Sequence, residues 1–242
     1  MEEPRDKRTA QAELVRHGGI LSLLTLVSRV LGLLREMAKA SLLGTSALSD
    51  AFSVAFMIPN LFRRLFAEGS IAVAFIPTFK EYLLENRGQG AVGQGGAAEN
   101  PEKIADFISC FFTFLTFIVS LAVVLGILIS PLVVPLFGME ELDETVLLTR
   151  LMFPFLGFIS LAALFQGILN SLRIFTPSGL APILLNIVTI LCAYGLSPFM
   201  KNPARAMAAG ILIGGFLEAA VQFPFVLRKA REFRWKGAFV FT

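Results

Sequence analysis

The sequence predicts an all-α fold, a polytopic membrane helix bundle with six transmembrane helices. Hydrophobic residues occupy 55% of the 242 positions, above the ~45–50% that is usual in soluble domains. Charged residues occupy only 16%, which is low for a solvent-exposed surface. The apolar residues also fall into six runs, each long enough to supply the ~20 residues with which a helix crosses a bilayer.

The first two spans are predicted over residues 14–43 and 51–79, after a charged, polar segment of residues 1–13. Both spans are longer than a bilayer requires, so we expect them to tilt or to extend beyond the membrane. No small-residue cleavage motif follows the first apolar run. That run is therefore expected to be a retained helix rather than a signal peptide. Pro59 predicts a kink in the second span.

The other four spans are predicted over residues 104–136, 146–169, 180–200 and 204–227, and residues 228–242 follow them. Pro154 and Pro182 lie inside spans and predict kinks, which membrane helices tolerate when neighbours satisfy the freed backbone groups. In the last span, Gly210 and Gly214 form a G-x-x-x-G motif. This motif lets a neighbouring helix approach closely, and we favour packing within the chain over dimerisation.

The charges in the connecting segments predict the orientation in the membrane. Lysine and arginine gather before the first span, between the second and third, and after the sixth. The opposite loops carry few basic residues, and one of them, residues 138–145, is acidic. By the positive-inside rule, residues 1–13 and 228–242 are both expected to be cytoplasmic, on either side of a six-helix lobe of residues 14–227.

The remaining motifs do not indicate catalysis or a cofactor. Residues 88–93 read G-x-G-x-x-G, but dinucleotide binding needs that motif between a strand and a helix, and here it lies in a polar linker. A single histidine, His17, excludes a multi-histidine metal site, and Cys110 and Cys192 lie in apolar runs, as buried structural thiols do. The sequence predicts neither an enzyme nor a nucleic-acid partner.

Four arginines lie inside the first two spans, where hydrocarbon would otherwise surround the chain: Arg29, Arg35, Arg63 and Arg64. An arginine at the centre of a membrane helix costs roughly 2.5–3.5 kcal/mol. These residues must therefore face a wet cavity or counter-charges inside a bundle. Arginine is also the side chain best suited to bidentate contact with phosphate, so the cluster points to an anionic substrate.

Polar residues follow helical spacing in both of these spans. In the second span, Asn60, Arg64 and Glu68 succeed one another at intervals of four residues, and Arg64 and Glu68 can pair along the helix. Two polar faces turned toward each other would line a hydrated cavity. The stripe of the first span consists of Ser22, Thr25, Arg29, Gly32, Glu36 and Lys39, with Ser28 and Arg35 beside it.

A structural role for these charges is the alternative. Glu36, Asp50 and Glu68 could neutralise the arginines, in which case the charged residues would only hold helices together. The different depths of the arginines along the two spans favour a path for an anion.

Several runs of the sequence are distinctive. The longest run is Ile58–Ser70, with the sequence IPNLFRRLFAEGS. The others are Ser28–Arg35 (SRVLGLLR), Ser49–Phe52 (SDAF), Ala74–Pro77 (AFIP), Phe153–Pro154 and Ala181–Asn186 (APILLN). Together these runs resemble the MurJ (MviN) family of lipid II flippases, which belongs to the MOP exporter superfamily. The resemblance spans nearly the whole chain.

The resemblance implies a two-lobe carrier that moves lipid II, an undecaprenyl-diphosphate glycolipid, across the bacterial plasma membrane by alternating access around a cationic cavity. It implies no cofactor, but it allows coupling to the membrane potential or to a cation. This chain resembles the first lobe only, so a second lobe is an expected partner beside lipid II and membrane lipid. The implied substrate-binding residues are Arg29, Arg35, Arg63 and Arg64, with supporting roles for Ser28, Glu36, Asp50, Asn60 and Glu68.

Glu36 departs from the family, in which aspartate is common at that position.

Two other functions stay open. One is a related exporter of another polyprenyl glycolipid or of a drug, although the match over residues 63–69 argues against it. The other is a non-transporting membrane scaffold, which the missing second lobe makes more plausible.

Overall fold

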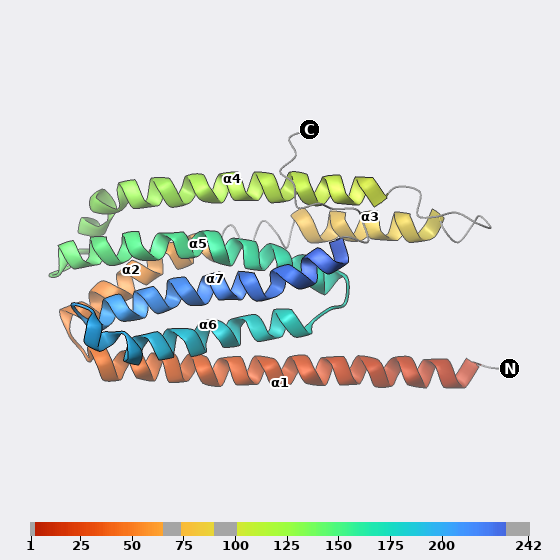
Figure 1. Cartoon of the computed structure of the whole chain (residues 1–242), viewed down its shortest axis with the longest axis horizontal. Helices are drawn as coiled ribbons and strands as arrows, with labels where there is room; N and C mark the ends of the chain where they lie inside the picture. The colour runs from red at the N-terminus through yellow and green to blue at the C-terminus, as the bar shows by residue number, and fades with distance from the viewer. Residues whose placement is uncertain (1–2, 65–73, 90–100, 231–242) are drawn as a thin grey trace.

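The computed structural model describes residues 3–64, 74–89 and 101–230, and over these residues the protein is helical, which confirms the all-α class. Figure 1 shows the helices as long rods that lie side by side in one bundle. They are α1 (Glu3–Leu43), α2 (Ala47–Arg63), α3 (Ile76–Gln89), α4 (Pro101–Val133), α5 (Leu142–Ser171), α6 (Thr176–Gly195) and α7 (Pro203–Ala230), with two short 3-10 helices, η2 (Val134–Phe137) and η3 (Ser197–Phe199).

Four described helices, α4 to α7, are long and apolar enough to cross a membrane. They correspond to the predicted spans 104–136, 146–169, 180–200 and 204–227. The most apolar segment of α5 has 61% of its residues buried inside the bundle, whereas that of α4 has only 17%. We therefore place α5 at the centre of the bundle and α4 at its edge, with most of the surface of α4 available to lipid.

The first two predicted spans differ more from the structure. Helix α1 begins at Glu3, well before the predicted start, and contains 41 residues. At ~1.5 Å per residue it is ~60 Å long, twice the ~30 Å hydrocarbon core, and Figure 1 shows it projecting beyond α6. The predicted span 51–79 falls on α2 and the start of α3, and residues 65–73 lie outside the described part of the chain.

The structure does not confirm six spanning helices. Helix α2 contains 17 residues, fewer than the ~20 that cross a bilayer. Helix α1 carries Arg29, Arg35, Glu36 and Lys39 within its apolar stretch, so composition alone does not mark it as a span. It stays a prediction that α1 and the chain around α2 cross the membrane.

Packing around α5 determines where the polar residues of α1 and α2 lie. Helix α5 contacts α2, α4 and α7, while α6 packs against α7 on one side and α1 on the other. One apolar core joins Phe52 and Phe155 to Met207. A second core at the α3–α4 side includes Phe75 and Phe79, whose ring centroids are 5.2 Å apart. Helix α1 thus packs mainly against α6 and helix α2 mainly against α5. A space is left between α1 and α2.

Glycines allow the close packing of α6 and α7. A Cβ atom on Gly210 would lie 2.8 Å from the Cβ of Cys192 and 3.0 Å from the Cα of Thr189. A Cβ atom on Gly214 would lie 3.1 Å from the backbone of Leu185. The G-x-x-x-G motif is therefore used inside the chain, as the sequence analysis favoured.

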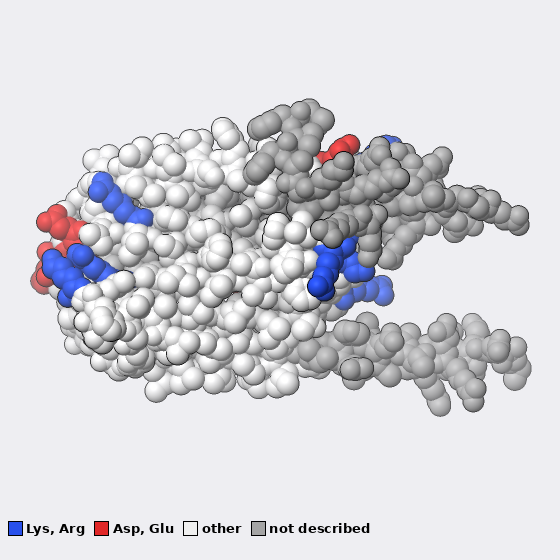
Figure 2. Space-filling model, in the orientation of Figure 1, with Lys and Arg blue, Asp and Glu red and all other residues white. Residues whose placement is uncertain are grey.

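Acidic and basic side chains meet at one end of the bundle. The turns between α1 and α2, α4 and α5, and α6 and α7 lie at this end, where Figure 2 shows both kinds of side chain. At this end, Glu144 at the start of α5 pairs with Arg205 at the start of α7 through two contacts of 2.7 Å. Asn202 donates to Glu144 at 2.9 Å. This bidentate pair joins the first turns of two spanning helices.

Candidate functional site

A polar cavity of about 410 Å³ lies between α1, α2, α5, α6 and α7. A second hollow of about 230 Å³ adjoins it, because Arg35, Phe56 and Asn60 line both. The polar residues that line the larger cavity are Arg35, Asn60, Arg63, Gln166, Asn186 and Glu218. Two of the four predicted arginines are thus brought to one cavity from two different helices.

Arg35 reaches this cavity from α1. Its Nη2 donates to Oε1 of Glu36 at 2.9 Å, and its guanidinium carbon lies 5.9 Å from the centroid of the Phe56 ring on α2. A guanidinium at this distance from an aromatic face is attracted to it. The carboxylate and the ring together orient the guanidinium at the wall shared by the two hollows.

Arg63 reaches the cavity from the last turn of α2, where the helix dipole favours a positive charge. Its Nε donates to Oδ1 of Asn60, one turn earlier, at 2.8 Å. This hydrogen bond holds the Arg63 side chain against its own helix.

Lys39 adds a third cation, at the smaller hollow. Its Nζ donates to Oγ of Ser53 on α2 at 2.6 Å and lies 5.8 Å from the centroid of the Phe52 ring. The lysine was predicted as part of the polar stripe of α1 but not as a site residue. Its contacts with α2 show that the C-terminal end of the polar stripe faces that helix.

The other predicted site residues do not line these two hollows. Arg29, Arg64 and Asp50 are exposed, and Asp50 lies in the first turn of α2. Ser28 contributes only its backbone, since its carbonyl accepts a hydrogen bond from Nδ2 of Asn186 at 3.2 Å and so ties α6 to α1. Glu68 lies outside the described residues.

Sequence analysis missed Glu218, a single carboxylate in the sixth predicted span. It lies on α7, lines the larger cavity and is only 6% exposed. The sequence alone could have pointed to this residue, because a charged carboxylate inside a membrane span is costly for the same reason as a charged arginine. The described residues contain no cluster of His, Cys, Asp or Glu side chains that could hold a metal ion.

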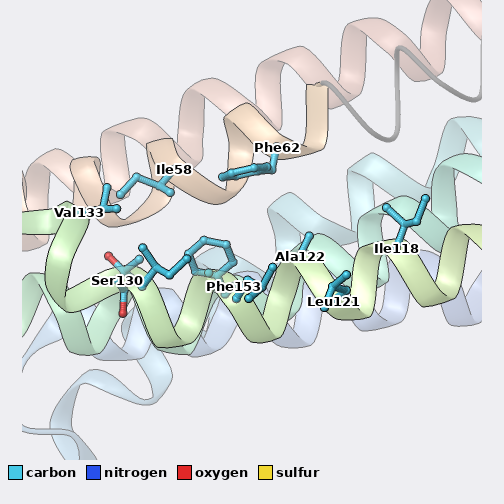
Figure 3. A pocket seen from close by; sticks show the side chains of 12 residues that line it. Ile58, Phe62, Ile118, Leu121, Ala122, Ser130, Val133 and Phe153 are labelled. Atoms are coloured by element: carbon cyan, nitrogen blue, oxygen red, sulfur yellow. The ribbon is translucent and has the colours of Figure 1, made fainter.

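An apolar groove of about 470 Å³ lies on the other side of α2, between α2, α4 and α5. Figure 3 shows Ile58 and Phe62 of α2 across the groove from Leu121 of α4, with Phe153 of α5 beside them. No charged residue lines this groove. An anionic group therefore fits the polar cavity and not the groove.

The fold and the cavity define an α-helical membrane protein whose bundle contains a polar cavity lined by two arginines. Comparison with known proteins gives the family. The sequence model of the family described as lipid II flippase MurJ matches residues 39–241. The chain belongs to the lipid II flippase MurJ family.

Individual proteins of this family are also similar to the chain. The chain is 48% identical over 219 residues to a probable lipid II flippase MurJ of Treponema pallidum, covering 90% of this chain and 40% of that protein. It is 37% identical over 206 residues to the lipid II flippase MurJ of Burkholderia cenocepacia, covering 83% of this chain and 37% of the relative. A solved structure of a lipid II flippase MurJ in an inward closed conformation superposes with a TM-score of 0.67 at 28% identity, over 92% of this chain and 43% of that one.

The chain therefore spans about 40% of the length of the relatives that it matches.

Proposed function

We propose that this chain forms one lobe of a transporter that flips lipid II, or a similar anionic polyprenyl-diphosphate glycolipid, across the bacterial plasma membrane. The observation that carries the proposal is that Arg35 and Arg63, from two different helices, line one polar cavity in a chain of the MurJ family. The diphosphate of such a lipid is the anionic group that the cavity would receive.

The chemistry of the crossing explains why guanidinium groups are needed. A diphosphate that leaves water loses its hydration, and an isolated charge is very costly in a medium of low dielectric constant. Guanidinium groups held in fixed orientations replace those hydrogen bonds, and their planar forks match two phosphate oxygens at once. In this proposal Arg35 and Arg63 bind the diphosphate, Glu36 orients Arg35, and Asn60 orients Arg63.

The exposed arginines have a place in the same proposal. Arg29 and Arg64 would complete the anion site where this lobe faces the second one, with Ser28, Asp50 and Glu68 in supporting roles. The second lobe would be supplied by further chain or by a separate polypeptide. The lobe would comprise six spans, with α1 and the chain around α2 as the first two, and the lobes would rock against each other to expose the site alternately to each side of the membrane.

The first prediction is that this chain alone does not flip lipid II. Expressed alone in a flippase-depleted bacterium, the 242-residue chain is expected to reach the membrane without restoring growth, because alternating access needs two units that move against each other. Co-expression with the second lobe of a relative should restore growth. Colony formation and a membrane immunoblot measure the two outcomes. Growth supported by the chain alone would show that one lobe is enough and would overturn the two-lobe proposal.

The second prediction concerns orientation. By the positive-inside rule, we expect the acidic loop of residues 138–145 outside the cell. We expect the polar linker that contains residues 88–93 inside. In a variant without Cys110 and Cys192, a cysteine placed at exposed Glu141 should react with an impermeant maleimide in intact cells. A cysteine at Gln94 should react only after permeabilisation. Labelling of Gln94 from outside would reverse the proposed orientation.

A further inference from the structure

Arg150 lies on the outer surface of the bundle, away from the polar cavity. It is exposed and sits in the third turn of α5, about 12 Å from the start of that helix. The adjacent helix α4 has the smallest buried share of the four apolar helices, 17%, so lipid is expected on this side of the bundle. An arginine next to hydrocarbon is costly and marks a functional position whose partner should be identified.

Contacts with α4 restrain Arg150 and leave its outer nitrogens unused. Its Nε donates to the carbonyl oxygen of Ile127 at 3.2 Å and to Oγ of Ser130 at 3.3 Å. Ser130 donates to the same carbonyl at 2.9 Å. Within the described part of the chain, the two Nη atoms of Arg150 donate to no group. The free side of the guanidinium is therefore available to an anion such as a phosphate, which its planar fork can bind through two oxygens.

A hollow of about 520 Å³ lies beside Arg150, on the surface that α4 and α5 form together. A second charged residue, Asp143, lines the same hollow from the first turn of α5. It lies seven residues before Arg150, on the same face of the helix and about 10 Å nearer to its start. Asp143 is exposed and has no partner among the residues that the structure describes. The other lining residues are apolar: Pro131, Leu142, Val146 and Leu147.

The order of these groups along α5 matches a phospholipid whose headgroup carries a primary amine. In a bilayer the acyl chains form the hydrocarbon core and the headgroup lies outside it, with the amine beyond the phosphate. Arg150 is the deeper of the two charged residues, and Asp143 lies nearer to the end of the bundle. Apolar residues of α4 continue inward from Pro131 at helical spacing, and two of them, Leu128 and Val124, are 66% and 53% exposed.

We propose that this hollow binds one molecule of phosphatidylethanolamine from the leaflet at this end of the bundle. The Nη atoms of Arg150 bind the phosphate, the carboxylate of Asp143 accepts hydrogen bonds from the ammonium group, and an acyl chain lies along α4. The lipid thereby joins α4 to α5. The site is separate from the polar cavity and does not depend on lipid II. Its loss is expected to affect growth less than the loss of a cavity arginine.

Lipid titration followed by native mass spectrometry of the 242-residue chain in detergent tests this site. The probes are phosphatidylethanolamine, phosphatidylglycerol and diacylglycerol, all with the same two acyl chains. Phosphatidylethanolamine should bind most tightly, because it alone supplies both the phosphate and the ammonium group. Phosphatidylglycerol has the phosphate but no amine, and diacylglycerol has neither.

Two variants assign the two contacts. Arg150→Ala should weaken the binding of phosphatidylethanolamine about tenfold, because hydrogen bonds to a charged group are lost. Both phospholipids should then bind little better than diacylglycerol, and Arg150→Lys should recover part of the difference. Asp143→Asn should weaken phosphatidylethanolamine binding and strengthen phosphatidylglycerol binding, because the carboxylate no longer repels the anionic lipid. This variant alters one exposed carboxylate and no contact between helices, so it tests the site without disturbing the fold.

Lys201→Ala and Glu141→Gln are the matched controls. Both residues are exposed, and neither lines the hollow. Like Arg150 and Asp143, they differ in sign and lie toward the end of the bundle where α5 begins. Neither substitution should change the affinity for any of the three lipids.

Headgroup selectivity distinguishes this site from a surface that holds lipid by its chains alone. The site is supported if the preference over diacylglycerol is lost in Arg150→Ala, the preference over phosphatidylglycerol is lost in Asp143→Asn, and the controls keep both. Equal binding of the three lipids by the wild type overturns the proposal, because hydrocarbon contact would then explain it. Selectivity that survives both variants overturns it too, since the lipid would bind elsewhere. Tighter binding of phosphatidylglycerol than of phosphatidylethanolamine by the wild type contradicts the role of Asp143 and overturns the proposal.

Discussion

Alanine in place of Arg35 or Arg63 is expected to abolish lipid II flipping while the protein still reaches the membrane. Each guanidinium lines the polar cavity, and neither is needed to hold the apolar core together. Loss of a charge-assisted contact to a buried anion costs about 2–5 kcal/mol, and each ~1.4 kcal/mol is a factor of ten in binding. We therefore expect affinity for the diphosphate to fall at least ~30-fold.

Growth of a flippase-depleted strain, together with a membrane immunoblot for each variant, measures this effect. The same loss is expected for Arg29 and Arg64, although their exposed positions make it dependent on the second lobe. Lysine should rescue incompletely at one or more of the four sites, because it restores the charge without the planar fork.

Arg150 and Arg173 provide the matched controls. Arg150 is exposed, and its Nε donates to the Ile127 carbonyl and the Ser130 hydroxyl of α4. Arg173 is exposed in the turn between α5 and α6. Alanine at either position should have a milder effect. Normal growth of all four alanine variants, at Arg29, Arg35, Arg63 and Arg64, would mean that the arginines are structural and would remove the basis of the anion site.

The apolar helices were predictable because the signal is local. Helices α4 to α7 follow from runs of apolar residues of bilayer length, and their positions agree with the predicted spans to within a few residues. Arg35 and Arg63 were predictable for an energetic reason, since a charge in a membrane span needs a polar environment whichever helix supplies it.

The walls of the cavity were not predictable, because they depend on which helices pack together. Sequence analysis expected the polar faces of α1 and α2 to turn toward each other and line a hydrated cavity. Instead α2 packs on α5, and α1 packs on α6, so Gln166, Asn186 and Glu218 complete the walls. Residue spacing within one helix carries no information about a partner on another helix. The position of Glu218 in the wall of the same cavity as Arg35 and Arg63 therefore required the fold.

The described helices α1 and α2 differ in their bounds from the first two predicted spans for a related reason. The apolar run of residues 51–79 predicts one span, but the described helices there are α2 and α3. Hydrophobicity shows that a segment is buried in lipid or protein and does not show where a helix ends. Similarly, α1 extends through the polar residues before position 14, because polar residues are compatible with a helix that leaves the membrane.

Larger side chains at Gly210 and Gly214 are expected to have the second large effect, on folding rather than on transport. The backbone of α6 lies 3.0–3.1 Å from the positions that a Cβ atom would take at these two glycines. A backbone cannot move aside as the end of a flexible side chain can. Overpacking of this kind costs about 1–3 kcal/mol per site, so the double variant Gly210→Val, Gly214→Val should lose most of its folded population.

Thermal unfolding followed by size-exclusion chromatography in detergent measures this loss, with Gly157→Ala as the control. A Cβ on Gly157, in the neighbouring helix α5, meets no atom within 4 Å, so alanine there should leave the melting temperature unchanged or raise it. If the double valine variant melts with the wild type, α6 and α7 do not depend on this close approach. The two helices would then have room to separate, and the cavity walls supplied by Asn186 of α6 and Glu218 of α7 would not be fixed relative to each other.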